Sequence, residues 1–186
     1  MKKILILSAL VTALTSAGAM AADANINFNG TVSASTCTLN AADAAKTLTM
    51  PNVSAATLLA AGTAAYSTYN SSSSFGFTAC PAGLTKVTSA YMYQGSLISA
   101  NTGMAIPSSG TASNVALVVM QSATGDSTSV VNAGGVSTAT NQATITAGAA
   151  TVPVTVGITA YSPSYVPTLP TVGTYTGTYL VAFTYS

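Results

Sequence analysis

The chain has 186 residues but very few charges, and it has no histidine, arginine, glutamate or tryptophan. After residue 21 the charged side chains are Lys46, Lys86, Asp23, Asp43 and Asp126. Charged residues make up 4% of the chain, whereas about 25% is usual for a globular domain. Nucleic-acid binding requires cations that neutralise phosphates, so this composition excludes a nucleic-acid partner. A surface with little charge repulsion suits a protein that lives within an assembly.

The same absences argue against an enzyme. Serine and threonine are abundant, but without histidine or glutamate the usual general bases are missing. The three aspartates are far apart in the sequence, so a paired-carboxylate site would arise only through an accident of folding. The sequence therefore predicts no catalytic residue, no cofactor and no metal site.

The first 21 residues have the pattern of a signal peptide. Lys2 and Lys3 precede a short apolar run, residues 4–14, and Ala19-Met20-Ala21 supplies small residues at the two positions that a signal peptidase reads. The alternative, a transmembrane anchor, needs about 20 apolar residues. We therefore expect cleavage after Ala21 and export of residues 22–186.

Two cysteines, Cys37 and Cys80, follow the predicted signal peptide. Export places them in an oxidising compartment, where a disulfide is the default state. Metal binding is the rival interpretation, but the chain offers too few other ligands for a metal site. The sequence therefore predicts a Cys37–Cys80 disulfide.

Most of the chain has the composition of short β-strands, because β-branched residues, tyrosine and serine- or glycine-rich breaks dominate it. Val115 to Met120 is a continuous apolar run, typical of a strand buried on both faces. The expected strands are 43–50, 86–93, 115–120, 152–161 and 175–185, with a partner for 86–93 near Leu97 and Ile98. Residues 54–61 are expected to form a helical turn that Gly62 ends, and residues 66–74 a flexible loop.

Both ends of the mature chain alternate with a period of two. Near the N-terminus, one face of a predicted strand carries Ile26, Phe28, Gly30 and Val32. The Asn29-Gly30 pair leaves a hairpin open as an alternative there. At the C-terminus, one face carries Tyr175, Gly177, Tyr179, Val181, Phe183 and Tyr185. By itself this second pattern indicates only a half-buried strand, with Leu180 as a large apolar exception on the opposite face.

Three segments together suggest a family. Residues 22–32 are followed by Cys37, residues 51–80 end at Cys80, and Gly173 is the fourteenth residue from the end, with Tyr185 as the penultimate residue. In this order and behind a signal peptide, they resemble subunits of chaperone–usher fimbriae, the type 1 pilin family, and its major subunits in particular. The segment from about residue 86 to residue 150 adds little to the resemblance.

The resemblance implies an all-β fold, an incomplete immunoglobulin-like sandwich that lacks its last strand and is completed by a donor strand from a neighbouring subunit. It also implies three parts: a signal peptide at 1–21, an N-terminal donor-strand extension at 22–34 and a pilin domain at 35–186. The function implied is that of a structural pilus subunit, which polymerises by donor-strand exchange into a surface filament for adhesion. The preferred interpretation is the major shaft subunit, and the alternative is a minor tip or adaptor pilin. A tip adhesin would need an additional binding domain.

The resemblance also assigns roles to the two alternating ends. The donor knobs would be Ile26, Phe28, Gly30 and Val32. The groove strand, which a periplasmic chaperone would recognise first, would contain Gly173, Tyr175, Gly177, Tyr179, Val181, Phe183 and Tyr185. The implied partners are neighbouring pilin subunits in a head-to-tail polymer, the periplasmic chaperone and an outer-membrane usher. The implied location is an extracellular fimbria, reached through the periplasm.

Overall fold

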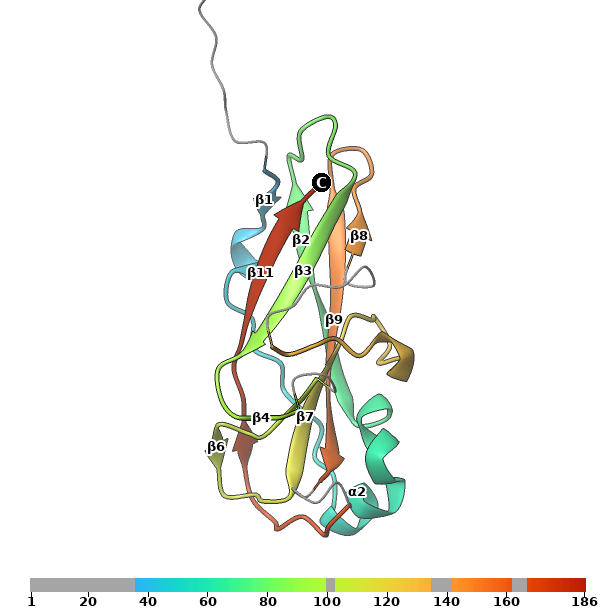
Figure 1. Ribbon diagram of the computed structural model, residues 1–186, viewed down its shortest axis with the longest axis vertical. Coiled ribbons are helices and arrows are strands. Elements are labelled where there is room, and N and C mark those ends of the chain that lie inside the picture. The colour runs from blue at the N-terminus through green and yellow to red at the C-terminus, as the bar shows by residue number, and fades with distance from the viewer. Residues whose placement is uncertain (1–35, 100–102, 135–141, 162–166) are drawn as a thin grey trace, which may run out of the picture. The chain divides into compact units, whose positions relative to one another are not determined.

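The computed structural model describes residues 36–99, 103–134, 142–161 and 167–186. They form antiparallel strands with a few short helices (Figure 1), so the all-β prediction is confirmed. The strands are β1 (Thr38–Leu39), β2 (Asn70–Thr78), β3 (Lys86–Tyr93), β4 (Leu97–Ser99), β5 (Met104–Ala105), β6 (Ser109–Gly110), β7 (Val115–Met120), β8 (Gln142–Thr144), β9 (Ala150–Ala160), β10 (Tyr175–Thr176) and β11 (Tyr179–Tyr185). The helices are η1 (Ala41–Asp43), α2 (Ala55–Ala61), η2 (Gly62–Ser67) and η4 (Ser127–Ser129).

The strands form two main sheets that face each other across a core. One sheet has the order β1-β2-β9-β7-β5-β4, the other has the order β11-β3-β8, and β10 pairs separately with β6. The inner faces of both sheets contribute to one hydrophobic cluster, in which Phe77 of β2 and Val152 of β9 meet Val87 and Tyr91 of β3. Packing of two apolar sheet faces is the arrangement of a β-sandwich.

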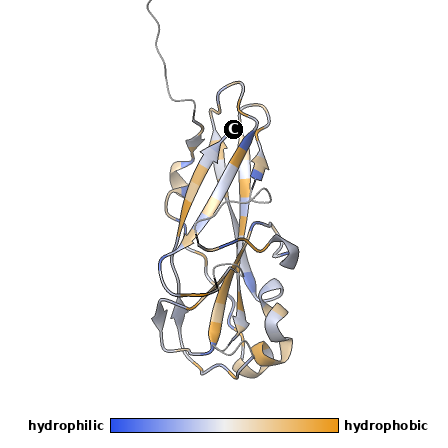
Figure 2. Ribbon diagram, in the orientation of Figure 1, coloured by the Kyte–Doolittle hydropathy of each residue, from blue (hydrophilic) through white to orange (hydrophobic). Residues whose placement is uncertain are grey.

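The centre of the larger sheet is its most apolar part. β9 pairs with β2 on one side, from Phe77↔Ala150 to Asn70↔Gly157, and with β7 on the other. Every residue of β7 is buried, as the continuous apolar run predicted, and Figure 2 shows this strand as largely hydrophobic. Gly157 must be a glycine because a Cβ atom there would overlap the backbone of Tyr66 in η2.

The predicted helical turn is confirmed as α2. Its N-cap residue is Ser54, whose hydroxyl accepts a hydrogen bond from the Thr57 amide at 3.0 Å, a common way of satisfying a helix start. The helix ends at Gly62, with φ at +69°, a value that favours glycine. Leu58 anchors the helix because it packs with Ile158 of β9 in a second buried cluster.

Two predicted elements in the first half of the chain are wrong. Residues 43–50 do not form a strand: Asp43 ends η1, and residues 44–50 belong to no helix or strand. The predicted loop at 66–74 contains the first half of β2, because Asn70 to Ser74 pair with β9, and Ser72 bonds Thr155 at 2.7 Å. Because Asn70 and the four serines that follow it are all polar, this segment has no alternation of apolar and polar residues from which a strand could be predicted.

The expected partner of β3 is also wrong. Leu97 lies in β4, which pairs with β5 in the larger sheet. Both sides of β3 are occupied by strands that are distant in sequence, β11 and β8. A short connection after β3 therefore leads the chain into the other sheet.

Candidate functional site

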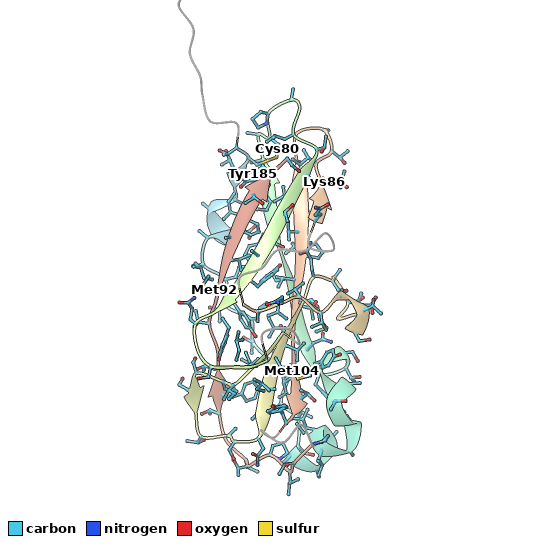
Figure 3. The ribbon with its side chains drawn as sticks, viewed as in Figure 1. Cys80, Lys86, Met92, Met104 and Tyr185 are labelled. Atoms are coloured by element: carbon cyan, nitrogen blue, oxygen red, sulfur yellow. A yellow bond between two sulfur atoms is a disulfide. The ribbon has the colours of Figure 1, made fainter. Side chains whose placement is uncertain are left out.

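The Cys37–Cys80 disulfide is present, with an S–S distance of 2.04 Å, so this prediction is confirmed. It joins the residue before β1 to the segment just after β2, and both cysteines are buried. Tyr185 packs against the same core cluster, and Figure 3 labels Cys80 and Tyr185 at one end of the domain. The bridge therefore holds the start of the described chain close to the end of its last strand.

The last strand, β11, has the two faces that the sequence predicted. Tyr179, Val181, Phe183 and Tyr185 are half-buried and pack on the core, whereas the residues between them are exposed. Leu180 is 57% exposed, as expected for a side chain on the outer face. β11 pairs in register with β3, from Tyr179↔Tyr93 to Tyr185↔Val87, and is an edge strand of its sheet.

The alternating segment 175–185 is not one continuous strand, contrary to the prediction. Its first part, β10, pairs with β6 through Tyr175↔Gly110 and Thr176↔Ser109. The strand changes partner at Gly177, where a Cβ atom would overlap the Leu117 side chain and lie 3.1 Å from the Tyr93 ring. Close packing at this point requires a glycine, and the chain passes from one pairing to the other beside it.

Aromatic contacts close the sandwich at the C-terminal end of β11. The Phe183 ring centroid lies 5.2 Å from that of Phe75 and 4.8 Å from that of Phe77, both in edge-to-face geometry. Tyr185 contacts Phe77 at 6.0 Å. Edge-to-face aromatic pairs are favourable because the positive ring edge meets the negative ring face. These contacts join β11 to the opposite sheet.

A pocket of about 590 Å³, here called the edge pocket, lies beside the other end of this strand. Residues 173–179 and Val181 line one side of it, and the extended segment 46–50 together with Asn52 lines another. Between these two segments lie core side chains of both sheets: Phe75, Tyr91, Leu117, Val119, Val154 and Val156. Such core residues are normally covered by another strand of the same domain, so the pocket marks the place where the sandwich is incomplete.

Two tyrosines that line the edge pocket, Tyr91 and Tyr179, have raised pKa values. Burial raises the pKa of Tyr91 to about 12. Burial, and secondarily the neighbouring Tyr93, raise the pKa of Tyr179 further. The Tyr179 hydroxyl has no hydrogen-bond partner within the described part of the chain, and its ring lies 4.9 Å from that of Tyr93. The environment around this side of the pocket is therefore apolar and uncharged.

One ion pair stands at the start of the segment 46–52. The Lys46 ammonium lies 2.7 Å from the Asp43 carboxylate and 6.0 Å from the centroid of the Phe75 ring. Lys46 also lines the edge pocket.

Within the ranges that the structure describes, no group of three or more histidine, cysteine, aspartate or glutamate residues could hold a metal ion. No helix in those ranges is long and apolar enough to cross a membrane.

The structure brings most of the predicted groove residues together. Tyr175, Gly177, Tyr179 and Val181 line the edge pocket, as does Gly173, while Phe183 and Tyr185 continue the same face into the aromatic contacts. The predicted donor knobs, Ile26, Phe28, Gly30 and Val32, lie outside the described residues. The segment 46–52 was not predicted to line the pocket; its only signal in the sequence was the alternation of Leu48 and Met50.

Comparisons with known proteins identify the fold. No protein-family model matches the sequence, and a search of curated proteins found no significant match. A chain from the structure of a chaperone–usher pilus, described in relation to rod uncoiling, matches with a TM-score of 0.60 and 18% identity, covering 89% of this chain and 97% of its own. The P pilus rod subunit PapA matches with a TM-score of 0.54 and 15% identity, covering 80% of this chain and 99% of its own.

These similarities extend over nearly the full length of both solved chains. The open edge pocket and the edge strand β11 agree with the incomplete sandwich of such subunits. The predicted fold class, an immunoglobulin-like sandwich that lacks its last strand, is thereby confirmed. The chain has the fold of chaperone–usher pilus rod subunits.

Proposed function

We propose that this protein is a structural subunit of a chaperone–usher pilus and that it polymerises by donor-strand exchange. The observation that carries the proposal is the edge pocket, a cavity of about 590 Å³ that core side chains of both sheets line beside an edge strand. Apolar core surface next to unpaired backbone groups is unfavourable in a protein that stays alone. A strand supplied from outside removes both problems at once.

The incoming strand would lie along β10 and β11, between them and the segment 46–52. Leu48 and Met50 in that segment are half-buried and alternate with exposed threonines, as in a strand that awaits a partner. An added strand would form main-chain hydrogen bonds to the free edge and place every second side chain into the pocket. Strand addition therefore agrees with the backbone on both sides of the pocket.

The proposed donor is the segment 22–34 of another copy of the chain. Its knobs repeat every second residue, which corresponds to about 6.6 Å along a strand, and the half-buried residues of β11 repeat at the same interval. Burial of Ile26, Phe28 and Val32 would contribute about 1.5–3 kcal/mol for each side chain. Gly30 would lie where two backbones come close. Because donor and acceptor are different surfaces, the contact is head-to-tail and produces a filament.

Assembly would require a periplasmic chaperone and an outer-membrane usher. A periplasmic chaperone would occupy the edge pocket first, because otherwise the unfilled pocket and the free strand edge would favour aggregation. An outer-membrane usher would then export the subunits, so that the filament forms on the cell surface and serves adhesion. Within such a filament, we assign this chain to the shaft, since a simple alanine-, threonine- and serine-rich composition suits an abundant subunit. A minor tip or adaptor subunit is the alternative, and the abundance of the chain in sheared filaments distinguishes the two.

The donor is tested by neighbouring substitutions in the segment 22–34. We expect Phe28→Asp to abolish filaments under electron microscopy, because a carboxylate would enter an apolar pocket. The matched control, Asn27→Asp, adds the same charge on the opposite face and should leave filaments intact. Filaments of normal length from Phe28→Asp, or from a chain that lacks residues 22–34, would refute the proposed function.

The acceptor is tested in the same way on β11. Val181 lines the edge pocket, whereas its neighbour Ala182 is exposed on the outer face. We expect Val181→Lys to prevent assembly and Ala182→Lys to permit it. If both variants assembled equally well, the edge pocket would not be the acceptor.

A further inference from the structure

The side of the edge pocket formed by residues 46–52 depends on how the chain leaves β1. β1 ends at Leu39, and the next amide, that of Asn40, donates to the Gly76 carbonyl at 2.9 Å. In a continuing antiparallel pair, the Asn40 carbonyl would accept from the Gly76 amide in return. That carbonyl instead accepts from the Asp43 amide at 2.8 Å and so closes the turn η1. Pairing with β2 stops here, and the Gly76 amide needs a different acceptor.

The Asp43 side chain supplies that acceptor. Its Oδ2 atom accepts from the Gly76 amide at 2.5 Å, and its Oδ1 atom pairs with the Lys46 ammonium at 2.7 Å. A Cβ atom on Gly76 would overlap the Asn40 side chain and lie 3.3 Å from the Asp43 carboxylate. Glycine at this position thus allows the carboxylate to approach the edge of β2. A single side chain takes over the hydrogen bond that a longer β1 would have made.

The carboxylate is ionised at neutral pH. The hydrogen bond from Lys46, followed by that from the Gly76 amide, lowers the pKa of Asp43 below its ordinary value of 3.8. The other charged groups in the described ranges have their own partners: Lys86 on β3 bonds Gln142 at 2.9 Å, and Asp126 caps η4 through the Thr128 amide. Among the residues that the structure describes, Lys46 is therefore the charged side chain that faces Asp43.

We propose that Asp43 is a positioning residue for the edge pocket. By ending the pairing of β1 with β2, it allows residues 46–52 to run along the edge pocket and keeps open the space that an incoming strand enters. Lys46 extends the effect, because it pairs with Asp43 and also lies over the Phe75 ring beside the pocket. This inference rests on the proposed function, since it concerns the capture of a donor strand.

The test is the binding of a fluorescent peptide that copies residues 22–34 to the full chain, followed by anisotropy. We expect Asp43→Asn to weaken binding about fivefold, because an ion pair is lost and a charge-assisted hydrogen bond becomes a neutral one. The matched control is Asp126→Asn, which neutralises an aspartate that caps η4 and does not line the pocket. This control should bind the peptide like the wild type.

A pH profile separates positioning from general stability. Wild-type affinity should fall more steeply than that of Asp43→Asn as the pH drops below 3.8 and Asp43 becomes protonated, whereas protonation of Asp23 in the peptide affects both profiles alike. Equal affinity of Asp43→Asn and wild type, or identical pH profiles, would overturn the inference while leaving the proposed function intact. No peptide binding by the wild type would overturn the proposed function itself. If Asp43→Asn does not fold, Lys46→Gln decides: weaker binding supports the inference and unchanged binding overturns it.

Discussion

Replacing Phe183 with alanine tests whether β11 joins the two sheets as the structure shows. Phe183 is half-buried on the inner face of β11 and contacts Phe75 and Phe77 of the opposite sheet. Leu180, on the outer face of the same strand, is 57% exposed. The two positions lie on one strand but differ in what their side chains touch, so Leu180→Ala is a matched control.

The contacts set the size of the effect. Two edge-to-face pairs contribute about 0.5–1.5 kcal/mol each. A Phe→Ala change in a complete core costs about 3–5 kcal/mol, and Phe183 falls toward the lower end because it is only half-buried. We therefore expect Phe183→Ala to lower the free energy of unfolding by about 3 kcal/mol. Leu180→Ala should change it by about 0.5 kcal/mol.

Urea unfolding of the full chain, followed by tyrosine fluorescence, measures both values under the same conditions. The slope with urea should be similar for the two variants, because the surface exposed on unfolding is nearly the same. Equal losses in the two variants, or a larger loss in Leu180→Ala, would show that the faces of β11 are reversed and would refute the packing described above.

Three further predictions concern stability. Replacing both Cys37 and Cys80 with alanine should lower the free energy of unfolding by about 4 kcal/mol, because the disulfide closes a loop with a sequence separation of 43. An unchanged midpoint in urea unfolding would contradict this. Gly177→Ala should cost about 1–3 kcal/mol, since its Cβ atom would overlap Leu117, and a stability equal to that of wild type would show that the strand can shift there. Burial raises the pKa of Tyr91 from 10.0 to about 12. The unfolded state therefore releases this proton at a lower pH than the folded state, and the free energy of unfolding should fall as the pH rises from 10.0 to about 12. Tyrosinate absorbance measures the titration, and titration of all native tyrosines near pH 10 would be inconsistent with this prediction.

Local patterns predicted the elements whose environment repeats along the chain. β3 and β7 have the bounds expected from the sequence, because one alternates between core and solvent and the other is buried throughout. α2 was predictable from its composition and from Gly62, and the disulfide from export and two cysteines. These features depend on residues that are close in sequence, or on the chemistry of one residue type.

The incorrect predictions have physical causes. Asn70 to Ser74 carry no hydrophobic pattern, but β9 supplies their partner and makes them a strand. The segment 43–50 alternates like a strand, but the Asn40 carbonyl accepts from the Asp43 amide, and the pairing of β1 with β2 stops at Leu39. Gly177 divides the last alternating segment because Leu117 and Tyr93 lie against it. In the first and last of these cases, a contact between distant residues decided the local structure.

The sequence by itself determined an all-β domain, its disulfide and an alternating last segment with an aromatic inner face. It also placed a second alternating segment, 22–32, near the other end of the chain. Only the tertiary structure decided that residues 46–50, Asn52, residues 173–179 and Val181 line one pocket together with core side chains of both sheets. A pocket is a property of packing, because the segments that enclose it meet through contacts between strands far apart in the chain, and no local pattern encodes such contacts.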